Sequence, residues 1–190
     1  MTCWQPLLRR AFLAALLFGG VTARPEAADA AIGGVGVVAG AGAHLANTGF
    51  AYTLNGALDV MGWGLAGTYW QQPSTSTTWL SAGVRKNVSM VPMLTVAPGV
   101  GFASLGSSGV ASSGPMVSVA AGFYPLMMPF AIDASVGAAM LLNGSTALPY
   151  SVGAKVSLMP FTALVVRYRG WEGVPTFKTG GPEIGAEIGF

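Results

Sequence analysis

Apolar residues alternate with polar or small residues along several segments of the C-terminal part of the chain. In 182–190 the apolar side chains occupy every second position, and glutamates and glycines occupy the positions between them. The same alternation runs through 164–169, 150–158 and 130–138. Successive side chains of a β-strand point to opposite faces, so this period of two predicts strands with one apolar face and one polar face.

The composition indicates that the chain is located in an apolar environment. Of its 190 residues, 52% are hydrophobic and only 8% are charged, whereas a soluble domain carries about 25% charged residues. The near balance of 9 basic and 7 acidic residues argues against a nucleic-acid binder that neutralises phosphates. A chain of this length has room for one domain, and its surplus of apolar residues favours a membrane protein.

Helical membrane spans fit the central segment poorly. The stretch 88–132 carries no charge, but five prolines and the Ser/Gly-rich run 105–114 interrupt it. A spanning helix needs about 20 consecutive apolar residues. The Gly-rich segment 32–45, with its G-x-x-x-G at Gly36 and Gly40, is the best helical candidate, and it is too short. A helical membrane protein is therefore kept only as an alternative, and 32–45 is interpreted as a strand.

Residues 1–30 have the features of a secretory signal peptide. A basic pair, Arg9 and Arg10, precedes the apolar run 11–21, and small residues before Ala30 form an A-x-A cleavage pattern. We expect cleavage after Ala30, with a cut after Ala23 as the alternative. The only cysteine, Cys3, lies in this segment, so the mature chain 31–190 is expected to contain no disulfide, thiolate metal ligand or cysteine nucleophile.

The C-terminus carries a pattern typical of small bacterial outer-membrane β-barrel proteins, whose last strand ends in Phe after alternating apolar residues. The matching residues here are Ile184, Ala186, Ile188 and Phe190, although that family often has an aromatic residue where Ile188 stands. Together with the signal peptide and the strand pattern, these residues make the whole chain resemble this porin-like family. The resemblance implies an outer-membrane location, with periplasmic chaperones and the barrel-assembly machinery, which reads the terminal strand, as partners.

The spacing of turns favours ten strands. A membrane-spanning strand needs about 9–11 residues, and residues 31–190 supply 160, or 16 per strand and connection for ten strands and 20 for eight. We expect short periplasmic turns at 61–62, 91–92, 128–129 and 159–160, and external polar connections at 46–49, 71–77, 104–114, 143–149 and 172–181. The predicted fold is an all-β, closed antiparallel transmembrane β-barrel, monomeric, with eight strands as the alternative.

This topology places nearly all aromatic residues near the two rims of the barrel. Trp and Tyr gather at membrane interfaces, so we expect them to form two interfacial belts. The outer belt is predicted to contain Phe50, Tyr52, Tyr69, Trp70, Trp79, Phe102, Tyr150, Tyr168 and Trp171, and the inner belt Trp63, Phe123, Tyr124, Phe130, Phe161 and Phe190.

The alternation also predicts which charged side chains face the lumen. They are four acidic and four basic residues: Asp59, Arg85, Asp133, Lys155, Arg167, Arg169, Glu183 and Glu187. Pairing the last two strands is expected to put Arg169 opposite Glu183. An ion-pair network that fills a narrow barrel is the favoured interpretation, and a charged pore constriction is the alternative. The other inward positions are mainly Gly, Ala and Ser, which leaves space for water in a ten-stranded barrel.

These features predict a non-enzymatic barrel that is either a narrow passive channel for small solutes or ions, or a structural component of the envelope. An alternative is a lipid-A-modifying enzyme that uses His44, the only histidine, but no carboxylate lies within ten residues of it. A surface adhesion barrel is a further alternative, although it would need longer loops. No cofactor is expected, and a single histidine without cysteine argues against a metal site.

Overall fold

The computed structural model describes residues 35–107, 110–125, 128–159, 161–174 and 177–189. The described chain is almost entirely β-strand, as the alternating sequence predicts, with one short 3-10 helix η2 (Pro73–Thr75). The strands are β1 (Val35–Ala46), β2 (Gly49–Val60), β3 (Trp63–Gln72), β4 (Thr77–Lys86), β5 (Val88–Val91), β6 (Leu94–Ser107), β7 (Val110–Phe123), β8 (Phe130–Met140), β9 (Thr146–Met159), β10 (Thr162–Val174) and β11 (Phe177–Gly189). In the described part of the chain, no helix has the length and apolarity to cross a membrane.

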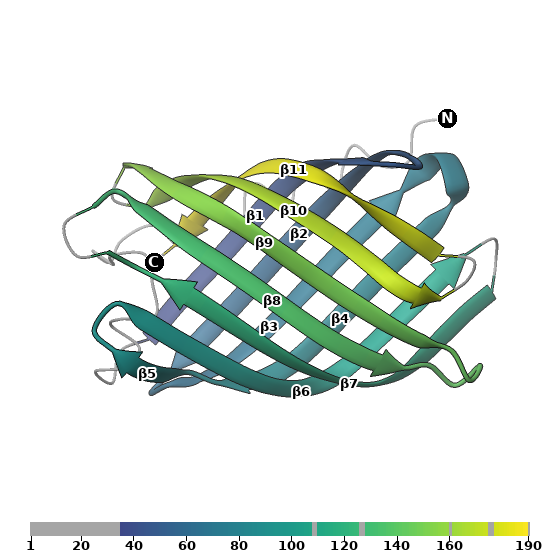
Figure 1. Cartoon of the computed structure of the whole chain (residues 1–190), viewed down its shortest axis with the longest axis horizontal. Coiled ribbons are helices and arrows are strands. Elements are labelled where there is room, and N and C mark those ends of the chain that lie inside the picture. Colours follow the sequence, from purple (N-terminus) through teal and green to yellow (C-terminus); the bar gives the residue numbers. More distant parts are fainter. Residues whose placement is uncertain (1–34, 108–109, 126–127, 160, 175–176, 190) are drawn as a thin grey trace.

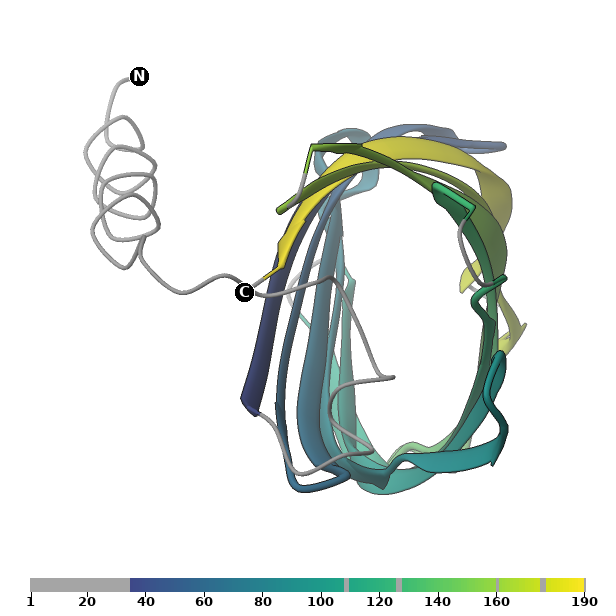
Figure 2. The same cartoon turned by 90° about the vertical axis from the view of Figure 1, so that its left-hand side faces the viewer.

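The strands form one closed antiparallel barrel (Figure 1). Sequence neighbours pair along the sheet, β1 also pairs with β11, and β4 pairs with β6. The short β5 continues β4 beyond Asn87 and pairs with the beginning of β6, so β4 and β5 share one place in the wall. The barrel therefore has ten strands, which confirms the favoured count and excludes eight. Viewed along its axis, it encloses an elongated cross-section (Figure 2).

The wall has an apolar outside and a more polar inside. Large apolar side chains such as Leu65, Val100, Val117 and Val136 are exposed on the outer surface. The residues between them are smaller or polar and are less exposed. A closed barrel with an apolar exterior satisfies its backbone hydrogen bonds internally and presents lipid-compatible side chains, as a transmembrane barrel must.

The two ends of the barrel differ. The end at which β1 begins and β11 ends is called here the termini end, and β2, β5, β7 and β9 also end there. The opposite end is called the aromatic end because of the lumen cluster described below, and β1, β3, β6, β8 and β10 end there. This alternation of turns matches the predicted topology. The connection between β8 and β9 turns at Asn143 and Gly144, and Gly144 has a φ of +81°.

The expected long connections at the aromatic end are mostly strand, and that prediction is wrong. Strand β6 continues to Ser107 and β7 begins at Val110, so residues 104–107 pair with residues 110–113. Likewise β10 extends to Val174 and β11 begins at Phe177. Ser and Gly composition suggested loops, but strand pairing satisfies the backbone of these runs whatever their side chains are.

The turn between β2 and β3 is a two-residue hairpin turn in which both central residues have positive φ, +52° at Met61 and +77° at Gly62. This turn type suits the twist of β-hairpins, but it disfavours any residue other than Gly, Asn or Asp. We therefore expect Met61→Asn to stabilise the barrel by about 0.5–1 kcal/mol. Urea unfolding in detergent micelles measures this change. The neighbouring Val60→Asn is the control, and an equal gain from both substitutions would contradict the explanation.

Candidate functional site in the barrel lumen

Six of the eight charged residues assigned to the lumen form one network centred on Arg167. Its guanidinium lies 2.9 Å from Glu187 Oε1, 3.6 Å from Glu183 Oε1 and 3.8 Å from Asp133 Oδ2. Lys155 Nζ lies 2.6 Å from the other oxygen of Glu187. These contacts link strands β8, β9, β10 and β11 across the inner surface of the wall.

The network continues through Arg169 toward the aromatic end. Arg169 Nε lies 2.9 Å from Glu183 Oε2, and its Nη2 donates a hydrogen bond of 3.1 Å to Asn55 Oδ1 on β2. Three acidic and three basic side chains thus compensate one another. Charges removed from bulk water need such partners, because an isolated ion in a low-dielectric interior costs several kcal/mol.

The remaining two lumen charges, Asp59 and Arg85, pair with each other nearer the termini end. Arg85 Nη2 lies 2.8 Å from Asp59 Oδ2, and Asn87 Nδ2 donates a 2.7 Å hydrogen bond to Asp59 Oδ1. Asn87 lies between the end of β4 and the start of β5. This interruption of the strand brings the side-chain amide of Asn87 into the lumen. The pair carries no net charge.

The register of β10 on β11 differs from the expected one. Arg167, not Arg169, lies opposite Glu183, and Arg169 lies opposite Gly181. A β-bulge between Trp171 and Val174 alters the pairing near the tip of this hairpin. The bulge shifts the register by one residue and does not explain the difference. The expected pair Arg169 and Glu183 is symmetric about position 176, whereas the observed pair Arg167 and Glu183 is symmetric about position 175, so an error of one residue in the assumed centre of the hairpin changes the partner by two residues. Arg169 still reaches Glu183 as a diagonal neighbour.

A cluster of aromatic side chains fills the lumen at the aromatic end. Trp171 is its centre, with ring centroids 5.0 Å from Trp70, 6.1 Å from Trp79 and 5.6 Å from Phe177. The three indoles are at most 1% exposed. Buried alanines, Leu105, Leu141 and Val174 pack around them. This aromatic cluster narrows the lumen at that end.

The prediction that Trp70, Trp79 and Trp171 belong to the outer interfacial belt is therefore wrong. Each lies near the end of its strand, as belt residues do, but each points into the lumen. Trp70 is two and four positions from the inward-facing Thr68 and Ala66, so it lies on the same face of the strand. This alternation is the sequence signal that could have predicted its inward orientation. Phe50 is exposed at the same end, Phe102 and Tyr168 are exposed nearer the middle of their strands, and Trp63, Phe123 and Phe130 are exposed at the termini end.

His44 lies inside the barrel, where it is fully buried beside the aromatic cluster. Trp70 Nε1 donates a 2.7 Å hydrogen bond to His44 Nδ1. His44 Nε2 is 3.1 Å from the carbonyl oxygen of Gly181 and can donate its proton there. Both ring nitrogens of a neutral imidazole are thus occupied, which leaves neither free to act as a general base in this arrangement.

These two hydrogen bonds predict a structural effect of replacing His44. In His44→Leu, the Trp70 N–H and the Gly181 carbonyl would remain buried without their partners, so we expect a loss of about 2–4 kcal/mol in unfolding free energy. His44→Gln, which keeps polar atoms, should lose less. Urea titration in micelles gives both values. Wild-type stability in His44→Leu would show that the two hydrogen bonds contribute little.

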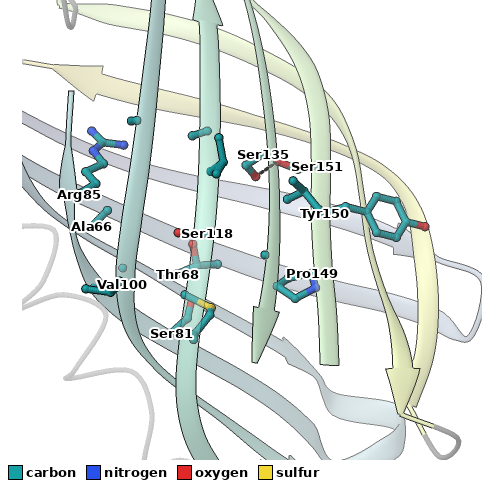
Figure 3. Close-up of a pocket in the computed structure, with 18 of the residues that line it drawn as sticks. Ala66, Thr68, Ser81, Arg85, Val100, Ser118, Ser135, Pro149, Tyr150 and Ser151 are labelled. Atoms are coloured by element: carbon teal, nitrogen blue, oxygen red, sulfur yellow. Dashed lines mark hydrogen bonds between the residues drawn. The ribbon is translucent and has the colours of Figure 1, made fainter. Parts of the chain in front are cut away.

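Between the aromatic cluster and Arg85 lies a cavity of about 210 Å3 (Figure 3). Its wall carries hydroxyl groups from Thr68, Ser81, Ser118, Ser135 and Ser151, which come from strands β3, β4, β7, β8 and β9. Glycines and alanines fill the positions between them, including Ala66, Gly83, Ala97, Ala120 and Gly137. Small side chains predominate on this part of the wall, so the lumen stays open there.

The cavity has apolar and charged borders as well. Trp79, Trp171, Met116 and Pro149 line it toward the aromatic end. Arg85 and Arg169 also line it, each held by its carboxylate partner. In the described part of the chain, no group of three or more His, Cys, Asp or Glu residues could hold a metal ion.

The sequence matches no protein-family model and no curated protein. Several solved barrel structures resemble this one. The KdgM porin, solved in complex with disordered oligogalacturonate, has a TM-score of 0.48 and 9% identity over 80% of this chain and 99% of its own. Omp33 of Acinetobacter baumannii has a TM-score of 0.42 and 6% identity over 82% of this chain and 98% of its own.

The translocator domain of the autotransporter NalP from Neisseria meningitidis has a TM-score of 0.42 and 13% identity, over 97% of this chain and 94% of its own. The closed wall of ten antiparallel strands and the apolar exterior decide the architecture. The chain has the fold of the outer-membrane β-barrels. What passes through it or binds to it depends on its own lumen residues.

Proposed function

We propose that this chain is a narrow outer-membrane channel for small solutes, with its aromatic end facing outward. One observation carries this proposal: the hydroxyl-lined cavity runs along the lumen beside a charge network that neutralises itself. A small barrel that served only as a structural element could fill its interior with side chains. Here Gly, Ala and Ser keep one part of the lumen open.

The path that we propose follows the cavity from the level of Arg85 to Trp79 and Trp171. The aromatic cluster is then the constriction, because hydrophobic narrowings hold back water and ions by dewetting. Flux through the wild-type protein is therefore slow. The ion pairs set the shape of the lumen, and because their charges cancel, they give it little preference for either sign of ion.

A structural envelope barrel is the second candidate, and the narrowing by the aromatic cluster favours it. Adhesion has less support, since the connections 47–48, 73–76 and 141–145 have only two, four and five residues. An enzymatic role for His44 has no support from its hydrogen bonds.

We also propose that residues 1–30 direct export and that the barrel-assembly machinery reads the terminal strand of a monomeric barrel. Ile184, Ala186 and Ile188 are exposed on the outer face of β11. Phe190 and residues 1–30 lie outside the described part of the chain.

Osmotic swelling of proteoliposomes in glycerol tests the channel. Wild-type protein should admit glycerol faster than protein-free vesicles do. Ser81→Phe, which fills the cavity, should return the rate to that of empty vesicles. Leu80→Phe makes a similar change on the lipid face, where the side chain is exposed, and should behave as wild type. Equal rates for wild-type and empty vesicles would leave the structural barrel as the function.

A further inference from the structure

The cavity has the composition of a ligand site, and its chemistry restricts the ligand. Our inference rests on the proposed function, because it names the class of solute that the channel takes. The relevant features are the hydroxyl wall, the aromatic border, the two paired arginines and the volume of about 210 Å3. Each excludes a different kind of occupant.

The hydroxyl wall provides hydrogen-bonding capacity that the protein does not use up. Ser135 and Ser151 share one hydrogen bond of 2.9 Å across β8 and β9. Ser81 and Ser118 face the same space from β4 and β7 (Figure 3). A hydroxyl has one donor and two acceptor positions, so these groups can both donate to and accept from a bound molecule. A purely apolar ligand would leave them unsatisfied.

The aromatic border offers a different surface. Trp79 and Trp171 line the cavity with their indole rings, and Met116 lies beside them. Trp171 Nε1 is buried and has no hydrogen-bond partner among the described residues. A buried indole N–H normally has an acceptor. A ligand oxygen near Trp171 could supply one, while the carbon skeleton of the ligand packs against the rings.

The charges at the border disfavour an ionic ligand. Arg85 is held by Asp59 at 2.8 Å, and Arg169 is held by Glu183 at 2.9 Å. An anion would compete with these carboxylates for the guanidinium groups, and a cation would meet two arginines. A neutral molecule disturbs neither ion pair.

The volume limits the size of the occupant. Pockets for drug-sized ligands have about 300–1,000 Å3, so a cavity of about 210 Å3 is small. We propose that the cavity binds a neutral polyhydroxylated solute no larger than a monosaccharide, with its hydroxyls on Ser81 and Ser118 and its carbon face on Trp79 and Trp171.

Calorimetric titration of the full barrel in detergent micelles tests the inference, with glucose as the probe. Glucuronate and glucosamine have the same ring but carry a negative and a positive charge. We expect saturable binding of glucose and at least about tenfold weaker binding of both charged sugars, because these disturb the ion pairs. Glucose binding that does not saturate would overturn the proposal, and so would equal affinity for all three sugars.

Two neighbouring substitutions locate the binding. Ser118→Leu fills the cavity and should weaken glucose binding about tenfold or more, since it removes both space and a hydroxyl. Val117→Leu changes the lipid face of the same strand and should leave the affinity unchanged. Ser81→Leu repeats the test from β4 if Ser118→Leu does not fold. Glucose affinity unchanged in a folded cavity-filling variant would place the binding elsewhere.

Binding in micelles needs no transport, so the two proposals can fail separately. Saturable glucose binding without glycerol flux in vesicles would refute the channel and keep the binding site. Flux without saturable binding would keep the channel and refute the binding site.

Discussion

Trp171→Ala should raise the conductance of the barrel in planar lipid bilayers by about tenfold or more, because it removes the centre of a hydrophobic constriction. Trp171 contacts Trp70, Trp79 and Phe177, and it also borders the cavity. Its removal would join the cavity to the space at the aromatic end. Trp79→Ala in addition should widen the opening further, because Trp79 lines the same border.

Trp63→Ala is the matched control for this prediction. Trp63 is exposed on the outer surface at the termini end, so the same truncation there should not change conductance. Truncating a buried Trp costs about 3–5 kcal/mol, and the migration of unheated samples in gel electrophoresis would verify that each variant is folded. A folded Trp171→Ala variant with wild-type conductance would show that the aromatic cluster does not limit flux.

Arg167→Met should destabilise the barrel by about 3–5 kcal/mol, the usual cost of breaking a buried ion pair from one side. Arg167 is the only residue of the network that contacts three carboxylates, and its removal leaves Asp133, Glu183 and Glu187 with too little positive charge. Urea unfolding of the folded barrel in micelles measures the change.

The double variant Arg167→Met/Glu187→Met separates charge imbalance from lost packing. It leaves Lys155, Arg169, Asp133 and Glu183, whose charges sum to zero. We therefore expect the double variant to regain part of the unfolding free energy that Arg167→Met loses. Val166→Met, on the lipid face of the same strand, should change stability little. A double variant less stable than Arg167→Met alone would argue against charge imbalance as the cause.

The architecture could be predicted from the sequence because the two-residue alternation of apolar and polar side chains determines it. Alternation in 150–158 and 182–190 indicated strands with two unlike faces, and the apolar composition indicated lipid on one of them. Turn spacing then favoured ten strands. The described structure confirms the strand count and the alternating positions of the turns.

The lumen was harder to predict, for reasons visible at single residues. Trp70 and Trp79 lie near the aromatic end of their strands, where belt residues are common. The prediction followed this position along the strand and ignored the alternation, which places both side chains on the inner face. The partner of Glu183 depends on the exact centre of the last hairpin, and turn composition locates that centre only to within about a residue. The cavity is bordered by Trp79 of β4 and by Arg169 and Trp171 of β10, and the periodicity of a strand does not indicate how far such side chains extend across the lumen.

Reaction of single cysteines with a water-soluble thiol reagent tests most directly whether the hydroxyl-lined part of the lumen is open. Cys3 is the only natural cysteine, so a Cys3→Ser background isolates each introduced thiol. Ser118→Cys, facing the cavity, should react about tenfold or more faster than Val117→Cys on the lipid face or Ala51→Cys behind the aromatic cluster. Equal reaction rates of Ser118→Cys and Ala51→Cys would contradict a lumen that is open at the cavity and constricted by the aromatic cluster.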